Sequence, residues 1–152
     1  MQIGYLADHK NYTEQAAEWI YHEFIQGIQH GVSHEQILNA FRECHKTKLP
    51  IRLIALEDGR CVGTVSIVQN DLKCRNYTPW LAALFVDESY RGNKIGEGLI
   101  ERVKQITKEL GYDELYLRTE HASNYYRRLG WQFVESCDDD YDLKPDVFKI
   151  KL

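Results

Sequence analysis

The pattern of apolar and polar positions divides the chain into strand-like and helix-like segments, most clearly in its middle. Apolar residues run without a break from Trp80 to Val86, which predicts a buried strand. A polar turn and a basic loop containing two glycines follow, up to Gly96. Apolar residues then recur at helical spacing, at Ile95, Leu99, Ile100, Val103, Ile106 and Leu110. The order in this stretch is therefore strand, loop, helix.

The first third of the chain reads as one short strand and two helices. Residues 3–7 predict the strand, and Asn11 or Thr13 is placed to cap a helix that runs to about residue 26. Apolar residues supply its expected buried face, namely Ala16, Ala17, Trp19, Ile20, Phe24 and Ile28. Ser33 with Gln36 three residues on indicates a capping box for a second helix, which reaches about Cys44.

Two strands, a parallel connection and a final strand pair account for the rest. Residues 51–57 and 61–69 predict strands, and Asp58-Gly59 between them is a hairpin turn signal. After the long helix, residues 114–119 predict a strand parallel to the one ending at Val86. A short helix over residues 122–129 and strands at 131–136 and 147–151 follow. The pattern by itself predicts an α+β fold with one right-handed β-α-β unit.

Composition narrows the class of protein. The 152 residues suit a single domain, 1–152, with its own core. The net charge of -4 argues against binding to nucleic acid, because proteins that bind nucleic acid carry an excess of basic residues. No apolar run is long enough to span a membrane. Four widely spaced cysteines with no Cys-x-x-Cys pair argue against a metal site and favour reduced thiols. We therefore expect a cytoplasmic protein with no nucleic acid, no membrane and no metal among its partners, and a homodimer is the candidate assembly.

The loop between the central strand and the long helix is suited to phosphate. A helix N-terminus offers free N–H groups and the positive end of the helix dipole. Gly92 and Gly96 let a ligand approach the backbone closely, and Arg91 and Lys94 add positive charge. The alternative is an ordinary strand-to-helix turn with two solvated cations.

Two motifs in this order resemble the GNAT superfamily of acyl-CoA-dependent N-acetyltransferases. Residues 86–96 resemble its Arg/Gln-x-x-Gly-x-Gly/Ala motif, with Lys94 where the family usually has its first glycine. Residues 125–131, Tyr-Tyr-Arg-Arg-Leu-Gly-Trp, are similar to its Tyr-x-x-Leu-Gly-Phe/Trp signature. The resemblance covers residues 50–137 best. It implies a mixed, mostly antiparallel seven-stranded sheet flanked by about four helices and splayed between its fourth and fifth strands, where acyl-CoA lies.

The resemblance also implies roles for residues in this chain. Acetyl-CoA would be the cosubstrate, with backbone groups of Leu84, Phe85 and Val86 polarising its thioester carbonyl and pairing with pantetheine. The pyrophosphate would lie on the loop made of Arg91, Gly92, Asn93, Lys94, Ile95 and Gly96. Tyr126 matches the general acid that protonates the departing thiolate, and Tyr125 replaces it if the register shifts by one. A buried strand and a core tyrosine are the structural alternatives.

The base and the acceptor are less defined by the sequence. Glu120 and His121 stand at the end of a strand where the site is expected, so Glu120 is the candidate base. A surface turn and a water-mediated proton transfer are the alternatives. Four aspartates in residues 138–142 would attract a small cationic amine if their loop borders the cleft, or form a solvated loop. A non-catalytic acyl-CoA-binding or sensor module on the same fold is the rival hypothesis for function.

Overall fold

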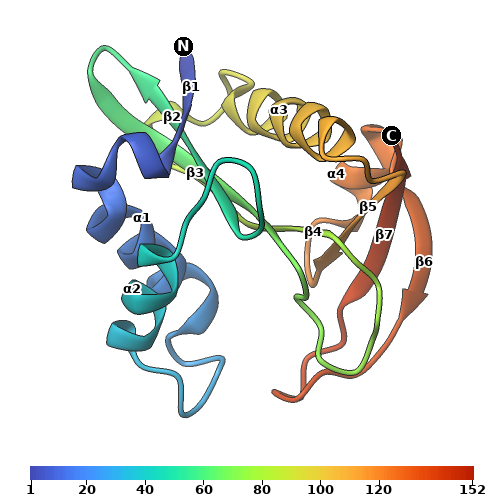
Figure 1. The fold of residues 1–152 in the computed structure, drawn as a ribbon. Helices are drawn as coiled ribbons and strands as arrows, with labels where there is room; N and C mark the ends of the chain where they lie inside the picture. The colour runs from blue at the N-terminus through green and yellow to red at the C-terminus, as the bar shows by residue number, and fades with distance from the viewer.

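A computed structural model describes all 152 residues, and its seven strands form one sheet in the order β1-β2-β3-β4-β5-β7-β6 (Figure 1). The strands are β1 Gln2–Tyr5, β2 Ile51–Glu57, β3 Arg60–Val68, β4 Trp80–Val86, β5 Glu114–Thr119, β6 Gln132–Ser136 and β7 Asp146–Lys151. All neighbours pair antiparallel except β4 and β5, which are parallel. The expected α+β fold with a mixed, mostly antiparallel sheet is confirmed.

Four α-helices cover the two faces of the sheet (Figure 1). They are α1 Thr13–Ile20, α2 His34–Arg42, α3 Ile95–Glu109 and α4 Ser123–Arg128. The helices α1 and α2 pack on one face, where their side chains form a cluster with residues of β2 and β3. The helices α3 and α4 pack on the other face, over the larger core. Each face of the sheet therefore has its own buried layer.

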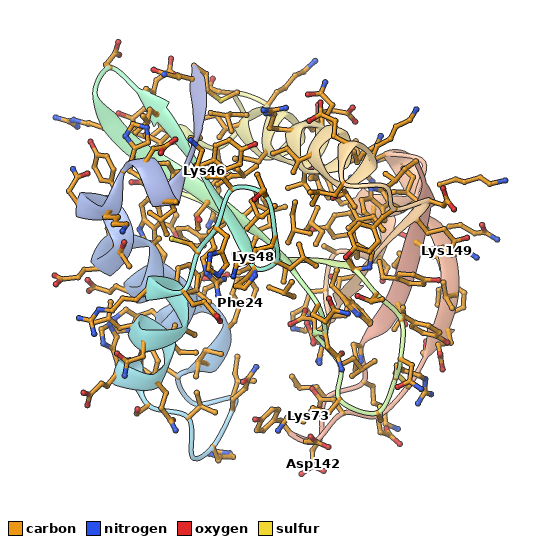
Figure 2. The ribbon with its side chains drawn as sticks, viewed as in Figure 1. Phe24, Lys46, Lys48, Lys73, Asp142 and Lys149 are labelled. Atoms are coloured by element: carbon orange, nitrogen blue, oxygen red, sulfur yellow. The ribbon has the colours of Figure 1, made fainter.

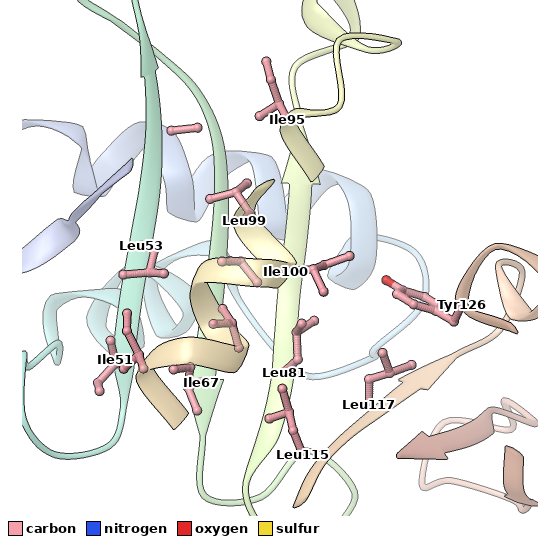
Figure 3. Packing of buried hydrophobic residues seen from close by; sticks show 14 of the residues in the cluster. Ile51, Leu53, Ile67, Leu81, Ile95, Leu99, Ile100, Leu115, Leu117 and Tyr126 are labelled. Atoms are coloured by element: carbon pink, nitrogen blue, oxygen red, sulfur yellow. The ribbon is translucent and has the colours of Figure 1, made fainter. Parts of the chain in front are cut away.

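The larger core is built from the helical stripe that the sequence predicts. Leu99, Ile100 and Val103 of α3 are buried against inward-facing residues of β2, β3 and β4 (Figure 3). Burying a side chain of this size stabilises the fold by about 1.5–3 kcal/mol. The helix α3 is thereby held against the sheet, and with it the loop that precedes it.

The sheet opens between β4 and β5. The only residue pair in register between these strands is Trp80 with Tyr116, near the start of β4. Beyond that pair the edge of β4 that faces β5 carries no β-ladder. The splay between the fourth and fifth strands, which the resemblance implies, is confirmed.

A β-bulge interrupts β4, although the sequence reads there as an uninterrupted strand. Thr64 pairs with Phe85 and Ser66 with Ala82, so Ala83 and Leu84 together stand opposite one residue of β3. Ala83 has φ +54°, a left-handed conformation that non-glycine residues rarely adopt. The bulge bends β4 where it separates from β5, and bulges of this kind often redirect strands beside active sites.

The first helix differs from its prediction in three ways. It begins at Thr13 with no side-chain cap, so the expected capping by Asn11 or Thr13 is wrong. After Ile20 it continues as a π-helical turn, Tyr21–Ile25. The wider turn buries Ile25 and leaves Phe24 37% exposed, because the next inward position after Ile20 is five residues on instead of four. The expected burial of Phe24 is therefore wrong.

Candidate active site

The last residues of β4 combine apolar side chains with partial exposure. Leu84, Phe85 and Val86 are all half-buried, unlike Trp80 and Leu81 at the start of the strand. Leu84 and Val86 pack against the core under α3, whereas Phe85 packs against the cluster under α1 and α2. An apolar strand end that stays exposed beside an unpaired edge is suited to bind an extended ligand through its backbone.

The loop after β4 has the backbone expected of an anion-binding turn. A short 3-10 turn, Glu88–Tyr90, leads into Gly92 at φ +87° and Lys94 at φ +61°. Lys94 is the N-cap residue of α3 and supplies no side-chain cap, so the first N–H groups of the helix are available to a ligand. The position where the family usually has glycine does require a left-handed residue, and here lysine adopts that conformation.

Arg91 makes two contacts within the protein. Its Nε donates a hydrogen bond of 3.0 Å to the backbone oxygen of Val86, and its guanidinium lies 5.4 Å from the ring centroid of Phe85. The side chain therefore ties the loop back to the end of β4. This contact fixes the geometry of the loop next to the exposed strand end.

Tyr126 projects from α4 toward β4. Figure 3 shows its hydroxyl directed at β4, between Ile100 and Leu117. The side chain is only 8% exposed, and burial raises the pKa of its phenol above the ordinary value. A phenol in this position remains protonated at neutral pH, as a proton donor requires.

Tyr125, the alternative acid, lies closer to the loop. Its hydroxyl is 3.7 Å from the position that a Cβ on Gly96 would occupy, and its ring meets that of Tyr126 edge-on at 5.2 Å. Burial, and after it the charge of Glu97, raises the pKa of Tyr125. The structure therefore brings both tyrosines to the same region, with Tyr126 the deeper of the two.

Two hydrogen bonds hold α4 in place. Thr119 at the end of β5 accepts a hydrogen bond of 2.9 Å from the backbone N–H of Ala122. Ser123, the first residue of α4, donates one of 2.6 Å to the carboxylate of Asp146 on β7. These bonds anchor the start of the helix that carries Tyr126.

Glu120, the candidate base, lies in an ion-pair cluster. The Nη2 atom of Arg118 lies 2.6 Å from an oxygen of Glu120 and 2.6 Å from an oxygen of Asp139. The Arg118 side chain is 14% exposed and that of Asp139 only 3%. Glu120 is thus held by a cation, and Asp139 is not an exposed charge.

Asp71, which sequence reasoning missed, completes this cluster from the loop between β3 and β4. Burial raises the pKa of its carboxyl group to about 7, with the Arg118 charge opposing that shift and the Glu120 charge adding to it. No sequence signal marks Asp71, because its neighbours in space are 47 or more residues away in the chain.

The rest of the acidic run lies at the far end of the β6–β7 connection. Asp138, Asp140 and Asp142 are exposed, and Asp140 lies 3.9 Å from Lys73. Figure 2 shows Asp142 and Lys73 in the same part of the molecule, at the foot of β5 and β7.

Neither a metal centre nor a membrane span is evident in the structure. No group of three potential metal ligands occurs, and all four cysteines are free thiols. No helix has the length and apolar character needed to cross a bilayer.

Comparison with known proteins identifies the family. A sequence model of the acetyltransferase (GNAT) family matches residues 13–131. The chain therefore belongs to the GNAT acetyltransferase family. An N-alpha-acetyltransferase, MAK3, from Arabidopsis thaliana is 29% identical over 103 residues, which are 65% of this chain and 54% of that protein. The chain thus spans about half the length of this curated relative.

Solved structures share the fold at low sequence identity. An aminoglycoside 6'-N-acetyltransferase complexed with coenzyme A superposes with a TM-score of 0.78 at 16% identity, covering 99% of this chain and 97% of that one. The aminoglycoside 6'-N-acetyltransferase from Enterococcus faecium gives 0.72 at 16% identity over 99% and 97%. The protein yncA from Salmonella typhimurium, solved with its cofactor acetyl-CoA, gives 0.72 at 17% identity over 100% and 94%.

Proposed function

We propose that the protein is an N-acetyltransferase that moves an acetyl group from acetyl-CoA to a primary amine of a small cationic acceptor. The observation that supports this most is the unpaired edge of β4, which lies between a glycine-containing basic loop and the hydroxyl of Tyr126. Residues 1–152 would act as one acetyltransferase domain, and both substrates would be bound together before reaction.

In this proposal the cofactor binds through backbone groups. The pyrophosphate lies on residues 91–96, at the N-terminus of α3, where N–H groups and the helix dipole stabilise its negative charge. Pantetheine runs along the exposed end of β4, at residues 84–86. An N–H group of this segment donates to the thioester oxygen and stabilises the negative charge that develops there.

The reaction is direct attack by the amine. The neutral amine nitrogen forms a bond to the thioester carbon, the carbon–sulfur bond breaks, and the sulfur leaves with both bonding electrons. Tyr126 donates its proton toward this sulfur. The proton lost by the amine passes to Glu120, directly or through water, and Arg118, 2.6 Å from that carboxylate, holds it in position.

The proposal is tested first by titrating the protein with CoA in a calorimeter and then by measuring thiol release from acetyl-CoA. The acceptor panel contains a polyamine, an aminoglycoside, an amino acid and a peptide amine. We expect CoA binding and amine-dependent thiol release. Binding without release by any amine would favour the non-catalytic acyl-CoA-binding alternative, and no CoA binding would contradict both.

A tyrosine pair tests the general acid. Tyr126→Phe keeps the ring and removes the proton, so we expect kcat to fall about 10²-fold, the usual scale for losing an acid, while CoA affinity stays the same. Tyr125→Phe is the matched control, because it removes the neighbouring hydroxyl. A larger loss in Tyr125→Phe would transfer the role to Tyr125.

A further inference from the structure

A cavity of about 340 Å³ lies between α1 and the end of β4. One face of the first helix and one residue of β4 line it, namely Gln15, Glu18, Trp19, His22, Glu23 and Phe85. The cavity is at the lower end of the size range in which small ligands are bound. None of its lining residues except Phe85 takes part in the site described above.

The floor of the cavity is aromatic. The rings of Trp19 and Phe85 lie 5.3 Å apart at an angle of 34°, and both side chains are half-buried. The guanidinium carbon of Arg91 also lies 5.4 Å from the ring centroid of Phe85. Because these rings are partly exposed, methylene groups of a ligand can pack on them. Such contact is favourable because it removes apolar surface of both the rings and the ligand from water.

The rim of the cavity is negative. Glu18 and Glu23 are exposed, and neither carboxylate lies within 4.0 Å of a lysine or arginine nitrogen. Glu18 has one basic neighbour, His22, whose Nε2 lies 3.7 Å from its carboxylate while its Nδ1 is hydrogen-bonded to Gln26 at 2.7 Å. Glu23 therefore has no cationic partner and Glu18 has only His22, so both carboxylates can pair with a cationic ligand.

The cavity reaches the reacting segment from the opposite face of the sheet. Phe85 points toward α1, whereas its neighbours Leu84 and Val86 point toward α3. A ligand on Phe85 would thus approach the open edge of β4 from the side away from α3. The cofactor can then occupy the side of the edge that faces α3.

We propose that this cavity binds the acceptor, and that the acceptor is a linear diamine or polyamine. The inference rests on the proposed function. The attacking amine must be neutral, whereas a nitrogen held by Glu18 and Glu23 stays charged, so one ligand has to carry two nitrogens. Its methylene spacer lies over Trp19 and Phe85, its second ammonium pairs with the two carboxylates, and its first amine reaches the edge of β4.

The experiment measures calorimetric binding of spermidine, n-butylamine and kanamycin to CoA-saturated protein, and kcat/KM for each with acetyl-CoA. n-Butylamine has the alkyl chain without a second cation, and kanamycin has several cations without an alkyl chain. We expect spermidine to be preferred to either by about 10-fold or more, since a paired charge and a buried spacer both contribute. Kanamycin binding as tightly as spermidine would overturn the linear acceptor.

Variants that remove the carboxylates of the cavity test whether spermidine binds there. Glu18→Gln combined with Glu23→Gln should weaken spermidine affinity about 10-fold or more, whereas Glu14→Gln, on the same helix but outside the cavity, should not change it. Equal spermidine affinity in the parent and the double variant would overturn the proposed cavity, even if other amines were acetylated. Binding that follows this pattern without any thiol release would instead support the cavity and contradict the proposed acetyl transfer.

Discussion

The carboxylates on the two sides of the open edge of β4 differ in whether an arginine or lysine side chain neutralises them. On the β5 side, Glu120 and Asp139 share the guanidinium of Arg118 at 2.6 Å each. On the α1 side, Glu18 and Glu23 have no lysine or arginine partner. The sequence suggests the reverse, because its densest acidic run, residues 138–142, lies on the β5 side.

The difference shows that the number of acidic residues in a segment does not set its attraction for a cation. Burial opposes the ionisation of Asp139, but hydrogen bonds from Arg118 and from the N–H groups of Tyr141 and Leu143 outweigh it and hold its pKa below the ordinary value. Such a carboxylate organises a loop. Exposed carboxylates without a lysine or arginine partner, such as those of Glu18 and Glu23, remain available to a ligand.

The largest expected effect on stability comes from removing the arginine that pairs with the carboxylates on the β5 side. Arg118→Met should lower the free energy of unfolding by about 3 kcal/mol, because it leaves Glu120 and the buried Asp139 without their cation. Urea unfolding measures the change. Arg42→Met, whose exposed side chain bonds only Asn39, is the control and should cost about 0.5 kcal/mol or less.

A compensated variant sharpens this result. Adding Glu120→Gln and Asp139→Asn to Arg118→Met removes the unpaired charges together with the cation, so part of the lost stability should return. If Arg118→Met unfolded at the same urea concentration as Arg42→Met, the cluster would not be a stabilising feature.

A smaller effect is expected at Asp71, whose carboxyl group is destabilising when ionised. Its pKa is raised to about 7 from the ordinary 3.8, so the folded state binds this proton more tightly than the unfolded chain. The stability that the proton provides is complete below about pH 4 and is lost as pH rises through about 7. Asp71→Asn should therefore be nearly as stable as the parent at about pH 4 and more stable than the parent at about pH 8. The full shift corresponds to about 4 kcal/mol, but Asp71 is only partly buried and water weakens the penalty, so we expect a gain of about 1–2 kcal/mol.

Unfolding by urea at several pH values tests this. Asp113→Asn is the control, because Asp113 is exposed and its carboxylate makes no hydrogen bond. A parent and an Asp71→Asn variant with parallel stability curves between about pH 4 and 8 would show that Asp71 titrates as an ordinary carboxylate.

The smallest effect concerns the exposed aspartates of the acidic run. Changing Asp138, Asp140 and Asp142 together to Asn should alter kcat/KM for a cationic acceptor by less than about twofold, and should leave most of its salt dependence in place. The Glu18→Gln, Glu23→Gln variant should flatten that dependence more. A triple Asn variant that removed the salt dependence would show that the loop attracts the acceptor, as the sequence suggests.

Much of the fold was predictable because its signals are local. The Asp58-Gly59 turn forms the hairpin between β2 and β3, with both residues at positive φ. Ser33 and Gln36 form the expected capping box. The apolar stripe of α3 and the order strand, loop, helix also appear as predicted. Each of these features depends on residues within a few positions of one another.

The tertiary structure decided the features that give the site its shape and charge. The bulge at Ala83 arises from pairing with β3, and the π turn after Ile20 from packing of Ile25, so neither is marked by its own residues. Arg118 meets Asp139 because β7 pairs with β5, and Trp19 meets Phe85 because α1 packs beside β4. Local sequence patterns fixed which segments form helices and strands and where the glycine-containing basic loop lies between β4 and α3. Only the packing of distant segments determined which charges are paired and which face a ligand, because electrostatic and apolar contacts depend on distances in space that a local pattern does not contain.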